Sequence, residues 1–130
     1  MVVAALVLAV GGSLAGAKKH KKKHKPEGRW DSQITLSLTT PTRFEGTVSS
    51  KLDACRNQRY VVLYYADPAS GNILPLSVQR TDSAGHYQVD LPKPAYPGSY
   101  AAQVADQRIR ANNAPQLCLY ASSPSVTVSG

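Results

Sequence analysis

The chain is 130 residues long, with two cysteines and a formal net charge of +7. That length allows one domain of about a hundred residues together with short appendages. The charge is concentrated near the N-terminus: from Pro26 onward nine cations stand against eight acids, a net of 9 − 8 = +1. The body of the chain therefore offers no basic groove of the kind that binds nucleic acid specifically, and that function class is excluded.

Residues 1–17 form a short apolar segment. From Val2 to Ala17 there is no charged residue, and the segment ends in Ala15-Gly16-Ala17, which is typical of a cleaved secretory signal. It is shorter than the about 20 residues that cross a membrane. Six lysines follow it and none precedes it, a charge order that favours a cytoplasmic C-terminal side unless the true start codon lies upstream. We expect a signal peptide cleaved near Ala17 and a secreted or cell-envelope protein; a retained membrane anchor and a cytoplasmic location are the alternatives.

Residues 18–29 form a basic, low-complexity linker that is too self-repelling to fold. Its lysines suit an anionic envelope surface, at about 1 kcal/mol per lysine near a charged membrane, and the simplest alternative is a solvated spacer. Non-specific nucleic-acid binding and a metal held by His20 and His24, which the neighbouring ammonium groups oppose, are further alternatives. The lysines that would contact the anionic surface are Lys18, Lys19, Lys21, Lys22, Lys23 and Lys25.

From Trp30 the sequence changes to short runs of alternating apolar and polar residues, which predict strands. The run 59–66 is apolar on both faces, as a central strand would be, whereas residues 106–116 are predicted to be a long loop. The predicted strands are 34–38, 44–48, 59–66, the two strands of a hairpin over 74–91, 100–104 and 118–128. This pattern predicts an all-β fold over residues 30–130, an antiparallel Greek-key β-sandwich of about seven strands.

The stretch 78–89 carries the clearest turn signal, Asp82-Ser83-Ala84-Gly85. An aspartate at the first position can accept a hydrogen bond from the backbone two residues on, and a glycine at the last tolerates positive φ. Every second residue on both sides of this turn is assigned to one face, which predicts a hairpin with that face buried. The inward positions are Val78, Arg80, Tyr87, Val89 and Leu91. His86 falls out of phase with them and is expected to face solvent.

The two cysteines, Cys55 and Cys118, are 63 positions apart and belong to no metal-binding pattern. If the protein is exported, they are expected to form a disulfide, which would stabilise the fold by about 4 kcal/mol on the loop-entropy model. Two buried free thiols are the alternative in a reducing compartment.

Four short motifs occur in the order Phe44-x-Gly46-x-Val48, Cys55-x-x-x-Arg59-x-Val61-x-Leu63, Thr81-Asp82-x-x-Gly85-x-Tyr87-x-Val89 and Pro97-Gly98-x-Tyr100. Over residues 42–128 this series resembles the carboxypeptidase regulatory-like or prealbumin-like domains, small immunoglobulin-like sandwiches of secreted bacterial proteins. The resemblance implies seven strands, a hairpin turn at Asp82, and a hydroxyl of Tyr100 that holds a loop. It also implies a binding, spacing or wall-associated module without chemistry of its own.

The sequence contains no recognisable catalytic motif. It has neither G-x-S-x-G nor H-E-x-x-H, and His86 has no nucleophile in an activating motif beside it. Asp82 and Asp90 are explained by turn chemistry and solvent exposure. We therefore expect no enzyme activity, no cofactor and no metal site.

Two sets of residues are candidates for binding. Tyr60 and Tyr64 alternate along one strand and share a face, where exposed aromatic rings can contact a protein or a glycan; the alternative is that this face is covered. Arg108 and Arg110 can contact an anion or simply be solvated.

These observations lead to one expected function and one alternative. We expect a secreted, monomeric, non-catalytic β-sandwich module with a structural or binding role at the cell envelope, whose protein or glycan partner the sequence does not name. The alternative is a small extracellular carrier that uses a pocket between the sheets or the loop around Arg108.

Overall fold

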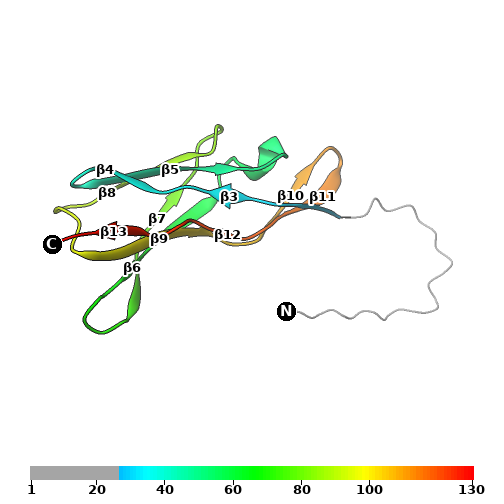
Figure 1. Ribbon diagram of the computed structural model, residues 1–130. Coiled ribbons are helices and arrows are strands. Elements are labelled where there is room, and N and C mark those ends of the chain that lie inside the picture. The colour runs from blue at the N-terminus through cyan, green and yellow to red at the C-terminus, as the bar shows by residue number, and fades with distance from the viewer. Residues whose placement is uncertain (1–26) are drawn as a thin grey trace.

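The computed structural model describes residues 27–130, which form short strands and one turn of 3-10 helix, η3 (Asp53–Cys55) (Figure 1). The first sheet contains β3 (Gln33–Ile34), β4 (Ser37–Thr40), β5 (Arg43–Ser49) and β8 (His86–Asp90). The second contains β6 (Tyr60–Ala66), β7 (Ile73–Arg80), β9 (Gly98–Val104), β12 (Ala121–Ser122) and β13 (Val126–Val128). A third, small sheet contains β2 (Gly28–Trp30), β10 (Gln107–Ala111) and β11 (Ala114–Cys118). The prediction of an all-β fold is confirmed.

The signal peptide predicted for residues 1–17 and the lysines and histidines of residues 18–25 lie outside the described residues. Strand β2 begins at Gly28, slightly before the domain start predicted at Trp30. Over residues 27–130 no helix has the length and apolar character needed to cross a membrane.

The first sheet is built around β5. Glu45 pairs with Ser37 of β4 on one side and with Gln88 of β8 on the other, both antiparallel. The predicted strand 34–38 is therefore two short strands, β3 and β4, that pair with successive parts of β5.

The second sheet has β6 and β9 at its centre. Strand β6 pairs antiparallel with β7 and with β9, which confirms its prediction as a central strand. The far side of β9 pairs with β12 and β13, into which the predicted last strand divides.

The hydrophobic core lies between these two sheets. The ring of Phe44 on β5 stacks 4.8 Å from the ring of Tyr100 on β9, centroid to centroid, so the two inner faces are in direct contact. The buried core residues are Ile34, Phe44, Val48, Val61, Leu63, Tyr87, Val89, Tyr100, Ala102, Val104 and Ala121. Two antiparallel sheets that share one apolar core are consistent with a β-sandwich.

The glycine of the Phe44-x-Gly46-x-Val48 motif makes room for a tyrosine. Gly46 pairs with Tyr87 of β8, and the Tyr87 hydroxyl crosses β5 to donate a hydrogen bond to the carbonyl oxygen of Thr35 on the other side. A Cβ at position 46 would lie 2.0 Å from that carbonyl oxygen and 2.5 Å from the hydroxyl, so a side chain does not fit. Burial raises the pKa of the Tyr87 phenol, which stays a hydrogen-bond donor.

The predicted hairpin over 74–91 is wrong in its strand pairing, although its turn is correct. The Oδ1 atom of Asp82 accepts hydrogen bonds from the backbone N–H groups of Ala84 and His86, both at 2.9 Å, and Gly85 has a φ of 90°. However, β7 pairs with β6 and β8 pairs with β5, so the turn carries the chain from one sheet to the other. Val78, predicted to face inward, is 58% exposed.

Protonation of Asp82 is expected to weaken this turn at low pH. The hydrogen bond from the His86 N–H, followed by that from Ala84, holds the pKa of Asp82 below its usual range. A carboxyl group whose pKa is lower in the folded than in the unfolded state stabilises the fold above its unfolded pKa and loses that contribution as the pH falls through the folded value. Asp82→Asn should therefore lower the free energy of unfolding at pH 7, and its difference from the wild type should shrink below about pH 4.

Urea denaturation of both proteins at several pH values measures this effect. Thr127→Ser, an exposed substitution on β13, is the control and should leave the pH profile unchanged. A difference between Asp82→Asn and the wild type that is constant from pH 7 to about pH 2 would contradict the role of the carboxylate.

The predicted loop 106–116 is instead a β-hairpin. Strands β10 and β11 pair antiparallel, with Ala111 opposite Ala114. The two residues between them, Asn112 and Asn113, have φ values of 56° and 59°, as a type I′ turn requires at both central positions. The Asn-Asn pair was a usable signal, because asparagine tolerates the left-handed region better than most residues. Arg108 therefore lies on a strand.

Candidate functional site

The residues weighed for catalysis do not come together. His86 is exposed on β8, and Asp82 is engaged in the turn before it. Asp90 accepts a hydrogen bond from Arg43 at 2.8 Å, and this bond, with one from Gln88, holds the pKa of Asp90 below its usual range. Among residues 27–130, no group of three or more His, Cys, Asp or Glu side chains is placed to hold a metal ion.

The predicted disulfide is present. Cys55 in η3 and Cys118 at the end of β11 are bonded, with their Cα atoms 5.4 Å apart, and both are fully buried. The second cysteine thus closes the β10–β11 hairpin rather than beginning the last strand. The bond ties the loop after β5 to the small third sheet.

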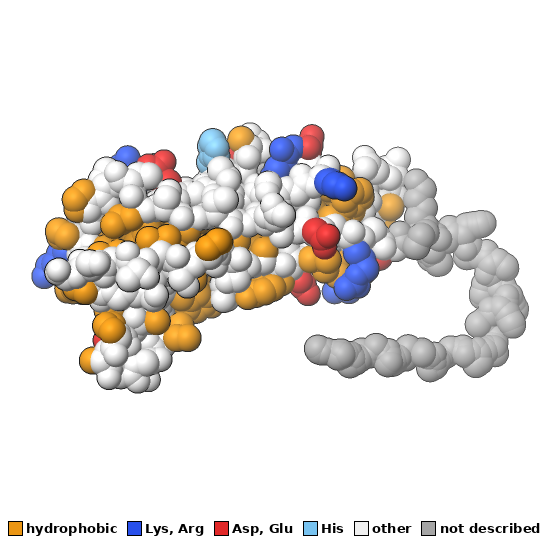
Figure 2. Space-filling model, in the orientation of Figure 1, with side chains coloured by type: hydrophobic (Ala, Val, Ile, Leu, Met, Phe, Trp, Pro, Cys, Tyr) orange, Lys and Arg blue, Asp and Glu red, His pale blue; other side chains and the backbone are white. Residues whose placement is uncertain are grey.

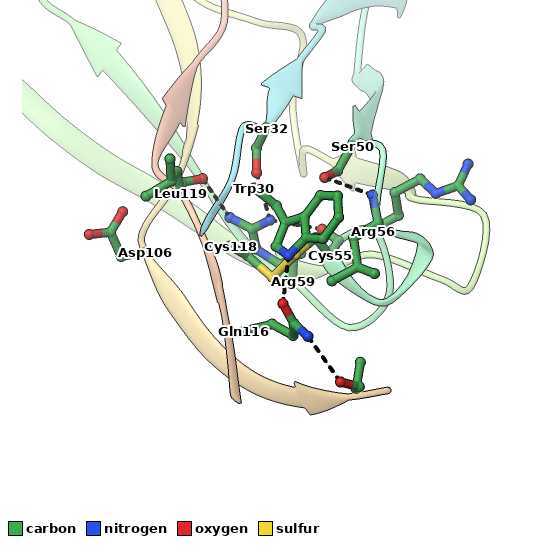
Figure 3. The surroundings of a disulfide bond; sticks show 12 residues. Trp30, Ser32, Ser50, Cys55, Arg56, Arg59, Asp106, Gln116, Cys118 and Leu119 are labelled. Carbon is green, nitrogen blue, oxygen red and sulfur yellow. Dashed lines mark hydrogen bonds between the residues drawn. A yellow bond between two sulfur atoms is a disulfide. The ribbon is translucent and has the colours of Figure 1, made fainter. Parts of the chain in front are cut away.

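A completely buried arginine, Arg59, lies beside this disulfide (Figure 3). Its Nη1 donates to the carbonyl oxygen of Cys55 at 2.8 Å and to the hydroxyl of Ser32 at 3.0 Å. Its Nη2 donates to the carbonyl oxygens of Ala105 and Leu119, both at 3.1 Å. One guanidinium group therefore holds together four segments that are distant in the sequence.

The hydrogen-bond partners of the Arg59 guanidinium are all neutral, so none of them compensates its positive charge. Burial lowers the pKa of the guanidinium, and the nearby carboxylate of Asp106 opposes that shift. The backbone N–H of Arg59 also donates to the hydroxyl of Thr81 at 2.8 Å, so the residue is fixed at both ends. With no exposed surface, this side chain positions the fold and does not contact a ligand.

Trp30 and Gln116 extend the same cluster (Figure 3). The indole Nε1 of Trp30 donates to the side-chain oxygen of Gln116 at 2.7 Å, and Gln116 donates in turn to the carbonyl oxygen of Ala111 at 3.0 Å. The parallel pairing of β2 with β11 is thus reinforced by side chains. Sequence reasoning missed this cluster, because a single arginine inside an apolar strand pattern does not show whether it is buried.

The two tyrosines singled out for binding lie on the outer face of β6. Tyr60 is 53% exposed and Tyr64 is half-buried, so this face is not covered within residues 27–130. The guanidinium carbon of Arg80 on β7 lies 4.8 Å above the centroid of the Tyr60 ring, a cation–π contact that orders both side chains.

Strand β7 continues this exposed apolar region. Its residues Ile73, Leu74, Leu76 and Val78 are 67%, 49%, 44% and 58% exposed, respectively. We call the β7 surface the set formed by Tyr60, Val62 and Tyr64 on β6 together with Ile73 and Val78 on β7, which lie opposite Ala66 and Val62 and so share their face. Leu74 lies opposite the inward-facing Tyr65 and therefore belongs to the other face. In Figure 2, hydrophobic side chains are visible on the projecting β6–β7 hairpin. Contiguous apolar surface of this kind marks interaction sites.

One hollow adjoins the β7 surface. It has a volume of about 380 Å³ and lies between Tyr64, Ile73 and Gln103. A second hollow, of about 290 Å³, lies on the core side of β7, between Leu76, Leu91 and Tyr96 of the proline-rich loop (residues 92–97). The β7 surface is therefore bordered by an apolar recess beside Tyr64.

Arg108 and Arg110 are placed away from this surface. Both project from β10 and are exposed, and the Nε atom of Arg108 forms an ion pair with Glu27 at 2.9 Å. They lie in the small third sheet, not beside Tyr60 and Tyr64.

No protein-family model and no curated protein sequence matches this chain.

Proposed function

We propose that the protein is a secreted, non-catalytic module with a binding role at the cell envelope, and that the β7 surface receives its partner. The observation that carries this proposal is the exposure of Tyr60, Ile73 and Val78 on one face of the β6–β7 pair. The buried disulfide is compatible with an extracellular location, since such bonds persist in oxidising compartments. The lysines of residues 18–25 would keep the module near an anionic envelope.

The fold that we propose for it is a seven-stranded Greek-key sandwich of the prealbumin-like or carboxypeptidase regulatory-like type. Two details of the proline-rich loop support this. The Tyr100 hydroxyl donates to the carbonyl oxygen of Tyr96 at 2.7 Å and so holds the proline-rich loop, as the Pro97-Gly98-x-Tyr100 motif implies. The Tyr65 hydroxyl also donates a hydrogen bond to that loop, to the carbonyl oxygen of Pro97.

The chemistry of the β7 surface suits a protein or a glycan. Aromatic rings contribute most of the energy at interfaces because they bury a large area and lose little side-chain entropy. Arg80, held over Tyr60, adds a cation at the margin of the surface. A sugar ring stacked on Tyr60 or an apolar protein side chain in the hollow beside Tyr64 would use these features.

Substitution of the tyrosines tests this function. Binding of the purified protein to a glycan array and to cell-envelope fragments should weaken at least about tenfold in the Tyr60→Ala, Tyr64→Ala double variant, because a central aromatic contact contributes about 2 kcal/mol. Tyr120→Ala is the matched control, since Tyr120 is equally exposed (54%) but lies outside the β7 surface.

Three outcomes would separate the alternatives. Equal binding by the double variant and the wild type would reject the β7 surface as the site. Loss of binding in Tyr120→Ala alone would move the site to the segment between β11 and β12. Saturable binding of a small apolar ligand, retained without the tyrosines, would favour the carrier function instead.

A further inference from the structure

We propose that β7 pairs edge to edge with β7 of a second copy of this chain, which forms a symmetric dimer with one continuous sheet. Within residues 27–130, β7 is the last strand of its sheet and pairs with β6 only. Its other edge carries unpaired backbone N–H and C=O groups beside exposed apolar side chains. Such an edge is a template for another strand.

The part of the edge that is free to pair can be identified from the ladder. Thr81 N–H donates to the carbonyl oxygen of Arg59 at 2.9 Å, which marks a hydrogen-bonded pair at the end of β7. Such pairs alternate with non-bonded pairs along antiparallel strands. Arg80 and Val78, at the intervening positions opposite Tyr60 and Val62, therefore turn their backbone groups away from β6.

The two halves of β7 differ in how well they are protected against the addition of another strand. Pro75 lacks an N–H, and the register with β6 shifts beside it, between Leu63 and Tyr64. Both features discourage strand addition in the first half. The extra residue at the shift is Leu76, because Leu63 pairs with Ser77 and Tyr64 with Pro75. Residues 77–80 have neither feature, and Arg80 is their only charged residue. A ladder centred on Val78 and confined to residues 77–79 avoids the proline and the irregular register.

The charge pattern suits a second copy in antiparallel orientation. With Val78 opposite Val78 of the other copy, Arg80 of each copy lies opposite Leu76 of the other. The two Arg80 residues are then four positions apart along the strand, about 13 Å, beyond the screening length of about 8 Å at physiological salt. No unlike charge on the partner is needed, and β7 has none to offer.

A second copy is also favoured over a free extended peptide. A peptide loses conformational entropy when it is ordered as a strand, whereas β7 is already ordered by β6. A two-fold symmetric contact uses the same edge on both copies, so the assembly stops at a dimer. The inference replaces the monomer expected from the sequence, and it does not depend on the proposed partner binding.

A cysteine at the centre of the contact tests the pairing directly. Opposite residues in a hydrogen-bonded antiparallel pair have Cα atoms about 5.5 Å apart, within the range of a disulfide. Because both natural cysteines are bonded to each other, the V78C variant of the full-length chain has one free thiol among residues 27–130. Mild oxidation should convert most of it to a covalent dimer on non-reducing gels. The Q88C variant, exposed on edge strand β8 of the other sheet, is the control and should stay monomeric.

Sedimentation of unmodified protein measures the association itself. Wild-type chain should show a monomer–dimer equilibrium, and Val78→Lys should raise the dissociation constant at least about tenfold, since a lysine on the edge opposes strand addition. Tyr120→Lys should not change it. Far-UV circular dichroism of each variant checks that the fold is intact, which the exposure of Val78 leads us to expect.

A monomer at all concentrations up to about 1 mM, crosslinking of V78C no faster than Q88C, or particles larger than a dimer would each overturn the proposal. The outcome is separate from that of the proposed function. If the Tyr60→Ala, Tyr64→Ala variant loses partner binding but still dimerises, both proposals stand. If the wild-type chain is a monomer but still binds its partner, only the dimer is rejected.

Discussion

Replacement of Arg59 by alanine is expected to lower the free energy of unfolding by about 3–5 kcal/mol. The substitution removes four hydrogen bonds from a charged donor and leaves three backbone carbonyls and one hydroxyl without that donor, of which the carbonyl of Cys55 is buried. It also empties a fully buried volume beside the disulfide. Equilibrium denaturation in urea, followed by circular dichroism, gives the change.

The control for this substitution is Arg43→Ala. Arg43 pairs with Asp90 at 2.8 Å, but both side chains are exposed, and such surface pairs contribute about 0–1 kcal/mol. Arg59→Lys keeps the charge but has a single nitrogen in place of the guanidinium fork, so its loss of stability should be large as well. If Arg59→Ala and Arg43→Ala were equally mild, the four-segment clamp would not be a principal source of stability.

Removal of the disulfide is expected to cost about 4 kcal/mol, because the bond closes a long loop and so restricts the unfolded chain. The Cys55→Ser, Cys118→Ser double variant measures this by urea denaturation. In the wild type both sulfur atoms are buried, so reductant alone should act slowly on the folded protein and quickly in denaturant. Rapid reduction under native conditions would show that this part of the fold opens easily.

The two effects are expected not to add. The carbonyl oxygen of Cys55 is itself an acceptor of Arg59, so loss of the disulfide loosens one of the four contacts of the guanidinium. Residues that share a partner show coupling of about 0.5–3 kcal/mol in double-mutant cycles. Unfolding of the single, double and triple variants gives that coupling, and simple additivity would mean that η3 keeps its position without the bond.

Local sequence signals predicted several features correctly. The chemistry of Asp82 and Gly85 indicated the turn between β7 and β8. The alternation on both sides of Phe44 and Val61 indicated strands and their buried faces. The pairing of Cys55 with Cys118 followed from there being only two cysteines and from the argument for export. Each of these signals depends on neighbours along the chain or on composition.

The surface around Tyr60 was predicted only as one of two alternatives. Its alternation with Tyr64 put both rings on one face, but a strand pattern cannot say whether another layer covers that face. The structure shows that this face is open and that it includes Ile73 and Val78 of β7. Val78 was assigned inward because it alternates like Val89, although the two residues belong to different sheets.

The sequence by itself therefore determined the all-β class, the turn at Asp82 and the disulfide, because propensity, turn chemistry and cysteine count act locally. Tertiary structure alone decided which strands pair, since a turn reverses the chain without selecting the sheet that the next strand joins. It also decided that Arg59 is buried and that β7 is exposed. Both facts depend on segments that are distant in the sequence: Ser32 and Leu119 contact Arg59 and help to bury it, whereas no comparable segment covers the side chain of Val78 within residues 27–130.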